Sequence, residues 1–182
     1  MGVTHVLPWA QPLTYDDLQT MPDDGRRHEL VDGVLIMTPA PKILHQHVVR
    51  RLLVLLSQVA LPEIELLPAP TDYVVSRHTV LQPDIVVARS ADFGEDNLQR
   101  TPLLVVEVLS VSTRRIDLGT KRLVFEGAGV PSYWLVDPDE PSLTALELEE
   151  GVYREAARVT GEQAYIASTP FPVRIVPTDL VR

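Results

Sequence analysis

The chain has 182 residues, of which 45% are hydrophobic and 5% aromatic, and this length and composition predict one domain with a mainly aliphatic core. The formal net charge of −9 argues against a protein that coats nucleic acid, because phosphate binding is largely electrostatic, but it leaves room for a local basic patch. The sequence contains no cysteine, which excludes disulfides and thiolate metal sites. It has no signal-peptide pattern and no stretch of membrane-spanning length, so we expect a cytoplasmic protein without a membrane partner.

The first forty residues predict a short helix followed by a β-hairpin. Thr14 begins a Thr-Tyr-Asp-Asp sequence that resembles a capping box, so a short helix is expected to start there and to end before Pro22. Residues 29–37 predict two strand segments that meet at a turn formed by Asp32 and Gly33.

The clearest predicted helix runs over residues 44–60. Its aliphatic residues recur on one half of a helical wheel drawn at about 100° per residue, which is typical of a helix that packs on a core. His45 falls near the middle of that apolar half, and Pro62 stops the helix. Short strands are predicted near residues 63–67, 73–76 and 85–88.

The second half of the chain predicts a strand, a helix and a second strand in succession. Residues 103–110 are almost entirely aliphatic, residues 117–128 form a helical pattern that Gly129 ends, and residues 132–136 form the next strand. Such a unit predicts a right-handed βαβ crossover with residues 103–110 inside the sheet. A hairpin at 143–149 and 152–158 follows, and no element is predicted beyond it.

Glu107 lies in the middle of the aliphatic strand 103–110. An unpaired buried carboxylate costs several kcal/mol, so either the strand lies at an edge of the sheet or a positive charge compensates Glu107. Asp84 opens the preceding strand, and the polar loop between the two strands lets them be neighbours. If both side chains face the same side, a hard divalent cation such as Mg²⁺ fits between them, because it binds oxygen ligands. The alternatives are a turn or cap role for Asp84 and an ion pair for Glu107.

Lys121 falls on the apolar side of its predicted helix, so we expect its ammonium to point toward the sheet. That side is a stripe formed by Leu118, Val124, Phe125 and Ala128. A lysine aimed at two carboxylates and a metal would orient an attacking water or stabilise a pentavalent phosphate. The alternatives are an ion pair with Asp117 four residues earlier or a stem that carries the ammonium out to solvent.

Other polar residues can be interpreted either as structural or as functional. Glu29 is either an exposed residue at the start of a strand or part of a site, and His45 is either a satisfied core histidine or a ligand. Arg114 and Arg115 lie in the densest basic stretch of the chain, and we expect them to contact phosphate.

Three segments of the sequence carry a resemblance to a known family: HELVDGVLIMTPAPKILHQHVVRRL, QPDIVVA and PLLVVEVLSVSTRRIDLGTKRLVFEGAGVPSYWLVDP. Together they resemble the Uma-two family of restriction-endonuclease-like proteins over roughly residues 14–155, most specifically over 102–138. The resemblance implies the PD-(D/E)XK nuclease fold, which is an α/β fold of the mixed α+β type with a central mixed sheet flanked by helices. It also implies a metal-dependent phosphodiesterase site and a homodimer.

The resemblance assigns motif positions to particular residues. The Pro-Asp pair that ends at Asp84 matches the PD element, and Glu107 opens the (D/E)XK element, in which Leu109 replaces the usual lysine. In this family the lysine comes from the following helix, a position that Lys121 matches. Glu29 matches the family's early acidic position.

These interpretations lead to one main hypothesis, an Mg²⁺- or Mn²⁺-dependent endonuclease that acts on nucleic acid, with DNA favoured. Its metal ligands are expected to be Asp84, Glu107 and the carbonyl of Val108. Lys121 is expected to position the attacking water, and Glu29 to bind a second metal or to hold the waters of the first. The expected substrate contacts are Arg114, Arg115 and His45.

Two other classes of function stay open. A chain with this fold but without catalysis would be a binding or assembly protein, which the charge of −9 and the residue Leu109 favour. A hydrolase that uses two carboxylates without metal, such as a glycosidase, leaves the inward-pointing Lys121 unexplained. For each class we expect one restriction-endonuclease-like domain over residues 1–182, with residues 1–13 and 159–182 as terminal extensions.

Overall fold

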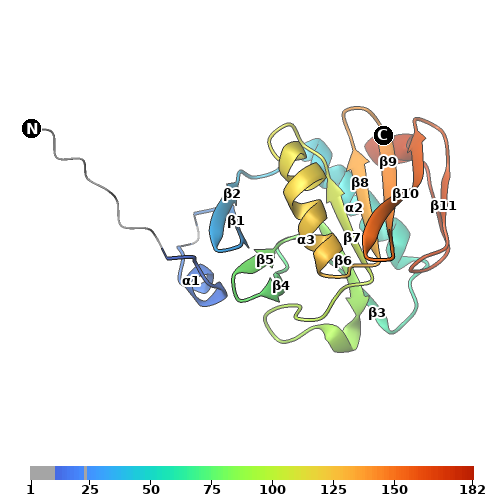
Figure 1. Cartoon of the computed structure of the whole chain (residues 1–182). Coiled ribbons are helices and arrows are strands. Elements are labelled where there is room, and N and C mark those ends of the chain that lie inside the picture. Colours follow the sequence, from blue (N-terminus) through green and yellow to red (C-terminus); the bar gives the residue numbers. More distant parts are fainter. Residues whose placement is uncertain (1–10, 23) are drawn as a thin grey trace, which may run out of the picture.

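The centre of the protein is a six-stranded mixed sheet (Figure 1). The computed structural model describes residues 11–22 and 24–182, so residues 1–10 of the expected N-terminal extension lie outside the described residues. Only β7 and β8 run parallel to each other, and the other neighbouring pairs of this sheet are antiparallel. Across the sheet the strands are β10 (Val152–Thr160), β9 (Ser142–Glu149), β8 (Ser132–Asp137), β7 (Leu104–Val108), β6 (Ile85–Arg89) and β3 (Ile64–Pro68).

One helix covers each face of this sheet, with α3 (Arg122–Gly127) on the near side in Figure 1 and α2 (Ile43–Ser57) on the far side. Side chains alternate along a strand, so Val106 of β7 packs in the cluster that contains α2, while Val105 packs with α3. The expected helix–sheet crossover from β7 to β8 is confirmed, as is the interior position of β7 beside β6. In the described part of the chain no helix is long and apolar enough to cross a membrane.

The helix predicted over residues 117–128 is divided into two parts. A π-helical turn spans Ile116–Lys121, and the α-helix α3 follows it. The expected inward position of Leu118 is wrong, because this side chain is 44% exposed. A π-helical turn closes its hydrogen bonds over five residues instead of four, so a wheel drawn for an α-helix misplaces residues within it. Phe125, beyond the turn, is buried as expected.

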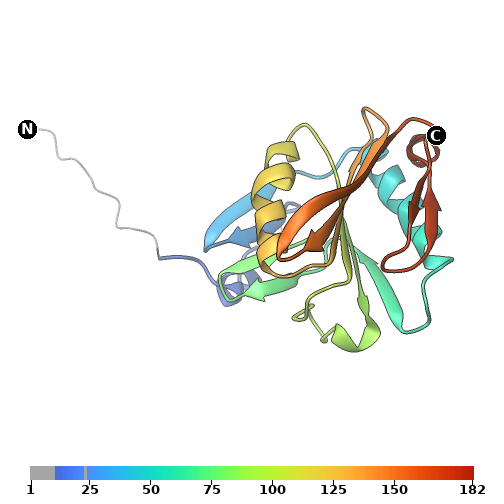
Figure 2. The same cartoon turned by 45° about the vertical axis from the view of Figure 1, so that its right-hand side comes forward.

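A second sheet of four strands lies beside the main sheet, toward the N-terminal side of the molecule (Figures 1 and 2). Its order is β2 (Val34–Thr38), β1 (Arg27–Val31), β5 (Thr79–Leu81) and β4 (Tyr73–Ser76). The short helix α1 (Tyr15–Gln19) begins at the expected capping box, in which the side chains of Thr14 and Asp17 each accept a backbone N–H of the other residue. Strand β5 is not predicted by the sequence patterns.

The last residues of the chain contribute to the main core. They form β11 (Tyr165–Ala167), β12 (Val173–Ile175) and α4 (Pro177–Val181). Phe171, Ile175 and Leu180 are buried in the same cluster as α2, and Arg51 of α2 donates to the carbonyl of Leu180 at 3.0 Å. Beyond Thr160, where β10 ends, the residues expected as an extension therefore pack on α2 and on the same face of the main sheet, where Tyr165 contacts the ring of Trp134 in β8.

The β1–β2 hairpin turns at Asp32 and Gly33, as the sequence predicts. Both residues have positive φ angles, 49° and 77°, which is the backbone of the two-residue turn that Asp-Gly favours. Gly33 also packs closely against the segment before α1, because a Cβ atom built on it would lie 2.4 Å from Cβ of Pro12. The turn therefore has room only for glycine.

Replacing Gly33 by alanine is expected to destabilise the fold more than the same change at another left-handed glycine. Gly151, in the β9–β10 turn, has a φ of 80°, and a Cβ atom added to it would have no neighbour within 4 Å, so Gly151→Ala tests the backbone cost alone, about 1 kcal/mol. Gly33→Ala adds the overlap with Pro12 and should cost about 2–4 kcal/mol. Urea unfolding measures both, and equal losses would contradict the close packing.

Candidate active site

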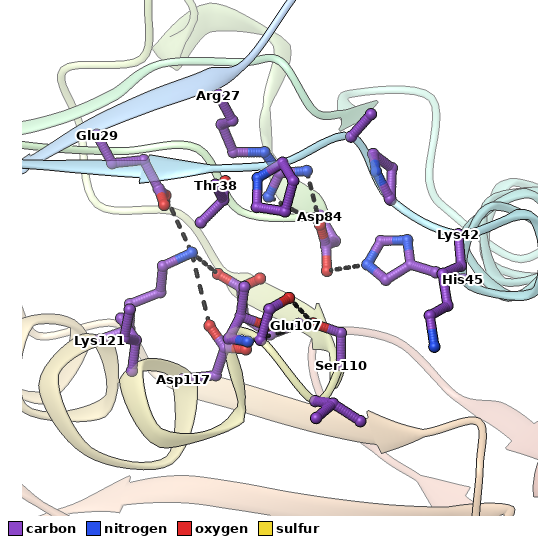
Figure 3. Close-up of a pocket in the computed structure, with 17 residues that line it drawn as sticks. Arg27, Glu29, Thr38, Lys42, His45, Asp84, Glu107, Ser110, Asp117 and Lys121 are labelled. Atoms are coloured by element: carbon purple, nitrogen blue, oxygen red, sulfur yellow. Dashed lines mark hydrogen bonds and ion pairs between the residues drawn. The ribbon is translucent and has the colours of Figure 1, made fainter.

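A hollow of about 280 Å³ lies where the small sheet, α2, β7 and the π-helical turn meet (Figure 3). Its charged lining comes from all of these elements and is largely buried. The charged residues that line it are Arg27, Glu29, Lys42, His45, Asp84, Glu107, Asp117 and Lys121. Five of the residues expected to form a site are therefore brought together here, namely Glu29, His45, Asp84, Glu107 and Lys121.

Asp84 and Glu107 come from neighbouring antiparallel strands and face the same side of the sheet. Ile85 pairs with Val106, and continuing that register by one residue places Asp84 opposite Glu107. The two carboxylates are 3% and 1% exposed, so both are removed from water. The two strands are neighbours, as the sequence allows, and the condition for a shared site is met because both acids face the same side.

Asp84 is surrounded by hydrogen-bond donors. Nη1 and Nη2 of Arg27 both lie 2.9 Å from its Oδ1, while Nε2 of His45 at 2.9 Å and the backbone N–H of Val108 at 2.8 Å contact its Oδ2. Burial alone would raise the pKa of Asp84, but the hydrogen bond from His45, the charge of Arg27 and the Val108 N–H together hold that pKa well below its usual range. Asp84 is therefore an ionised carboxylate at any physiological pH.

Lys121 is a buried cation among three carboxylates (Figure 3). Its Nζ lies 2.9 Å from Oε1 of Glu107, 3.0 Å from Oε1 of Glu29 and 3.7 Å from Oδ1 of Asp117. Burial would lower the pKa of Lys121, but the charges of Glu107, Glu29 and Asp117 outweigh it and raise that pKa. The expectation that this ammonium reaches the Glu107 carboxylate is confirmed, and Lys121 is permanently charged.

The pKa of Glu107 is shifted in the opposite direction from that of Asp84. Burial raises its pKa, and although Lys121 lowers it, the nearby charges of Asp84, Asp117 and Glu29 raise it further, so the pKa of Glu107 lies well above its ordinary value. Two carboxylates on adjacent strands thus differ strongly in their hold on a proton. Such a separation of pKa values is typical of functional sites.

Lys121 and Asp117 both reach the hollow from the π-helical turn. Both side chains are buried, at 3% and 1% exposure, whereas Leu118 faces away. The hydroxyl of Tyr133 on β8 donates to the carbonyl of Asp117 at 3.0 Å, which fixes the start of the turn on the sheet. The ion pair of Lys121 with Asp117, expected as an alternative to a catalytic role, exists together with the contacts to Glu107 and Glu29.

The remaining predicted site residues lie outside the hollow. Arg114 pairs with Asp137 on the far side of the π-helical turn, and neither it nor Arg115 lines the hollow. Val108 contacts Asp84 through its N–H. Phosphate binding by the two arginines, and metal binding by the Val108 carbonyl, stay predictions.

Arg27 and Asp117 are site residues that the sequence hypothesis did not include. Arg27 lies two residues before Glu29 on β1, so strand alternation places both on the same face once Glu29 is assigned to the site. Asp117 lies four residues before Lys121, a spacing that brings two side chains of a helix together. Both signals are present in the sequence.

The donor set of the hollow suits a hard divalent cation. Oε2 of Glu29 and Oδ1 of Asp117 are buried and have no hydrogen-bond partner in the described structure, and oxygen is the ligand that Mg²⁺ prefers. Among residues 11–22 and 24–182, no group of three or more His, Asp or Glu side chains has the arrangement of a metal cage. Mg²⁺ needs no such cage, because it is held by one or two carboxylates together with waters and substrate oxygens.

The charges point to the same kind of ligand. When all are ionised, the four carboxylates of Glu29, Asp84, Glu107 and Asp117 face two buried or half-buried permanent cations, with the exposed Lys42 at the rim. In that fully ionised state, with His45 left out of the count, the interior has two more negative than positive charges. One divalent cation would compensate this excess.

A known protein family matches most of the chain, including all the residues that line the hollow. The family model of Uma2, described as "Putative restriction endonuclease", matches residues 15–178. The chain belongs to the Uma2 family. A search of curated proteins gave no match.

Among solved structures, this Uma2 chain is similar to a "putative nuclease belonging to DUF820" from Anabaena variabilis ATCC 29413. The two share 18% sequence identity with a TM-score of 0.76, and the match covers 93% of this chain and 98% of that chain. At this identity the likeness shows the fold, which is restriction-endonuclease-like, with the central mixed sheet flanked by helices that the resemblance implies.

Glu107→Gln is expected to change how the stability of the metal-free protein depends on pH. Because the pKa of Glu107 is raised by folding, the folded protein keeps a proton that the unfolded chain releases above about pH 4.3. The free energy of unfolding should then fall as pH rises through this window, by up to about 1.4 kcal/mol per pH unit. Glutamine does not titrate, so the free energy of unfolding of the variant should fall less steeply with pH over this window.

Denaturant unfolding between pH 3 and pH 8 in the presence of a chelator measures the effect. Asp84→Asn is the control with the opposite sign, because the lowered pKa of Asp84 contributes stability that is present above about pH 3.9 and lost as pH falls toward its folded pKa. Parallel profiles for Glu107→Gln and the parent protein would contradict the assignment.

Proposed function

We propose that this Uma2 protein is a metal-dependent endonuclease that hydrolyses phosphodiester bonds in nucleic acid, with DNA as the favoured substrate and Mg²⁺ or Mn²⁺ as the cofactor. The observation that supports the proposal is the meeting of Asp84 and Glu107 with the buried ammonium of Lys121 in one hollow. A homodimer, which would suit cleavage of both strands of a duplex, stays a prediction from the family resemblance, and a cytoplasmic location stays a prediction from the sequence pattern.

In this proposal Asp84 and Glu107 hold the cation, and Glu29 and Asp117 contribute negative charge around it. A bound divalent cation supplies electrophilic stabilisation of a phosphoryl oxygen and lowers the pKa of water. The two carboxylates differ in strength, since the pKa of Asp84 is lowered and that of Glu107 is raised. Asp84 would hold the cation as an ionised carboxylate, whereas Glu107 would have to release its proton to hold it.

Lys121 provides a fixed positive charge and directed N–H donors inside the hollow. Its ammonium is held by Glu107 and Glu29, so it needs little rearrangement to orient the attacking water or to stabilise the charge that develops on the phosphate. Hydrolysis joins the water oxygen to phosphorus and breaks the bond to the leaving oxygen, which takes up a proton. No covalent bond to the protein is needed.

A binding or assembly protein that keeps the nuclease fold is the second candidate. The observation that favours it is the state of Asp84, whose two oxygens are both engaged by Arg27, His45 and the Val108 N–H. In such a protein these contacts would be permanent. Metal binding and cleavage distinguish the two candidates.

Asp84→Asn is expected to abolish most of the metal response. Mn²⁺ or Mg²⁺ at millimolar concentration should raise the melting temperature of the parent protein, because a ligand that binds only the folded state stabilises it. The variant should lose most of this shift and its metal-dependent nicking of plasmid DNA. Asp139→Asn, an exposed aspartate after β8, is the matched control, and a parent protein that shows no shift would argue for the second candidate.

Lys121→Met tests the proposed role of the ammonium. Methionine keeps much of the stem volume and removes the charge, so the variant should be less stable than the parent protein. Where it is folded, it should still bind Mn²⁺ but lose nicking by roughly a hundredfold or more, as for removal of one transition-state donor. Lys42, the other lysine of the chain, lines the same hollow from an exposed position, so Lys42→Met should reduce the rate far less. Single-turnover nicking assays compare the two, and unchanged nicking by Lys121→Met would exclude the role.

A further inference from the structure

The carboxylate of Asp84 has no acceptor position left. An ionised carboxylate offers about four lone-pair sites on its two oxygens. Oδ1 accepts from two nitrogens of Arg27, and Oδ2 accepts from the Val108 N–H and contacts Nε2 of His45. A cation that binds Asp84 must therefore replace one of these partners, and the Val108 N–H is fixed by strand β7.

Arg27 is the partner best placed to move. It reaches Asp84 from β1, in the small sheet, and its side chain is 20% exposed while that of His45 is 10% exposed (Figure 3). Besides the hollow of the site, Arg27 lines an adjoining hollow of about 520 Å³, and the two hollows share the segment Pro39–Pro41 as a wall. The guanidinium thus has open space on either side of its contact with Asp84.

Charge decides which partner leaves. A guanidinium and a divalent cation on the same carboxylate oxygen repel each other, and a guanidinium keeps its charge at every physiological pH, whereas an imidazole also has an uncharged form. Arg27 also donates to the carbonyl of Gln82 at 3.0 Å, so one anchor would keep it at the site after its contact with Asp84 ends. Its freed N–H groups would then face the hollow in which a phosphate lies.

We propose that Arg27 is a phosphate-binding residue, which Asp84 holds in place until a divalent cation takes over that carboxylate. The inference rests on the proposed function. The planar fork of arginine matches the oxygens of a phosphate, and the exchange gives each positive group an anionic partner: the cation has Asp84, and Arg27 has the substrate. Cation binding and substrate binding are consequently coupled through this one side chain.

The coupling predicts effects of opposite sign when Arg27 is replaced. Without its guanidinium, Asp84 has two free acceptor positions and one competing positive charge fewer, so a cation should bind more tightly. The nucleic acid loses a phosphate contact and should bind more weakly. An arginine with only a structural role would weaken both, because its loss would loosen the site.

The test compares Arg27→Met with Arg26→Met in metal-free protein. Arg26 is the adjacent residue, its side chain is 58% exposed and it pairs with Asp24 at 3.8 Å, so this control removes the same charge without touching Asp84. Titration with Mn²⁺, followed by electron paramagnetic resonance of the free ion, should give a Kd roughly tenfold lower for Arg27→Met than for the parent protein. Arg26→Met should stay within about twofold of the parent.

The second arm measures binding of a labelled DNA oligonucleotide by fluorescence anisotropy, with and without Ca²⁺. In Ca²⁺ the Arg27→Met variant should bind more weakly than Arg26→Met, and without a divalent cation the two should bind alike, because Asp84 then occupies Arg27. If Arg27→Met does not fold, Arg27→Gln keeps a donor for Asp84 and removes the charge, and the same signs are expected.

The outcomes separate this inference from the proposed function. Mn²⁺ binding by the parent protein with equal or weaker binding by Arg27→Met would overturn the role of Arg27 and leave the metal-dependent nuclease standing. An unchanged DNA affinity of Arg27→Met in Ca²⁺ would overturn the phosphate contact. A parent protein that binds no Mn²⁺ at millimolar concentration would contradict the proposed function itself, and this inference with it.

Discussion

The buried ammonium of Lys121 is the interaction on which the site depends. Removing an ammonium from water costs several kcal/mol even after the protein relaxes, and here three carboxylates compensate it. Glu107 comes from the central strand β7, Glu29 from β1 of the small sheet and Asp117 from the π-helical turn. One cation therefore joins three parts of the chain, and losing one partner of a buried ion pair costs about 3–5 kcal/mol. The hollow exists because these parts are held together at this point.

The excess of negative charge in the hollow is difficult to explain by stability alone. An ion pair kept for stability would match Lys121 with one carboxylate, yet four acids surround the two interior cations. Burial is the main cause that raises the pKa of Glu107 and of Asp117, so the ionised form of each carboxyl group is less favourable here than in water. Proteins tend to retain such arrangements where a ligand or a reaction requires them.

Local patterns predicted those parts of the structure that depend on local geometry. The strand patterns made Asp84 and Glu107 possible neighbours, and the pairing of β6 with β7 then puts them on one face. An α-helical wheel turned Lys121 inward but misplaced Leu118, because the turn is π-helical. Strand alternation, applied from Glu29, would have found Arg27. The short elements β11, β12 and α4 have little pattern of their own, and their places are set by packing against α2, more than a hundred residues earlier in the chain.

Leu109 shows why a lysine at the usual motif position is not needed for this site. Leu109 lies two residues after Glu107, about 7 Å along the strand, and its side chain packs with Leu135 and Leu146 under the far side of the π-helical turn. A lysine there would lie beside an apolar floor, close to the arginines that line the neighbouring hollow. Lys121 lies in the π-helical turn, and its Nζ is 2.9 Å from Oε1 of Glu107. The ammonium beside Glu107 therefore comes from the π-helical turn and not from the position two residues after Glu107.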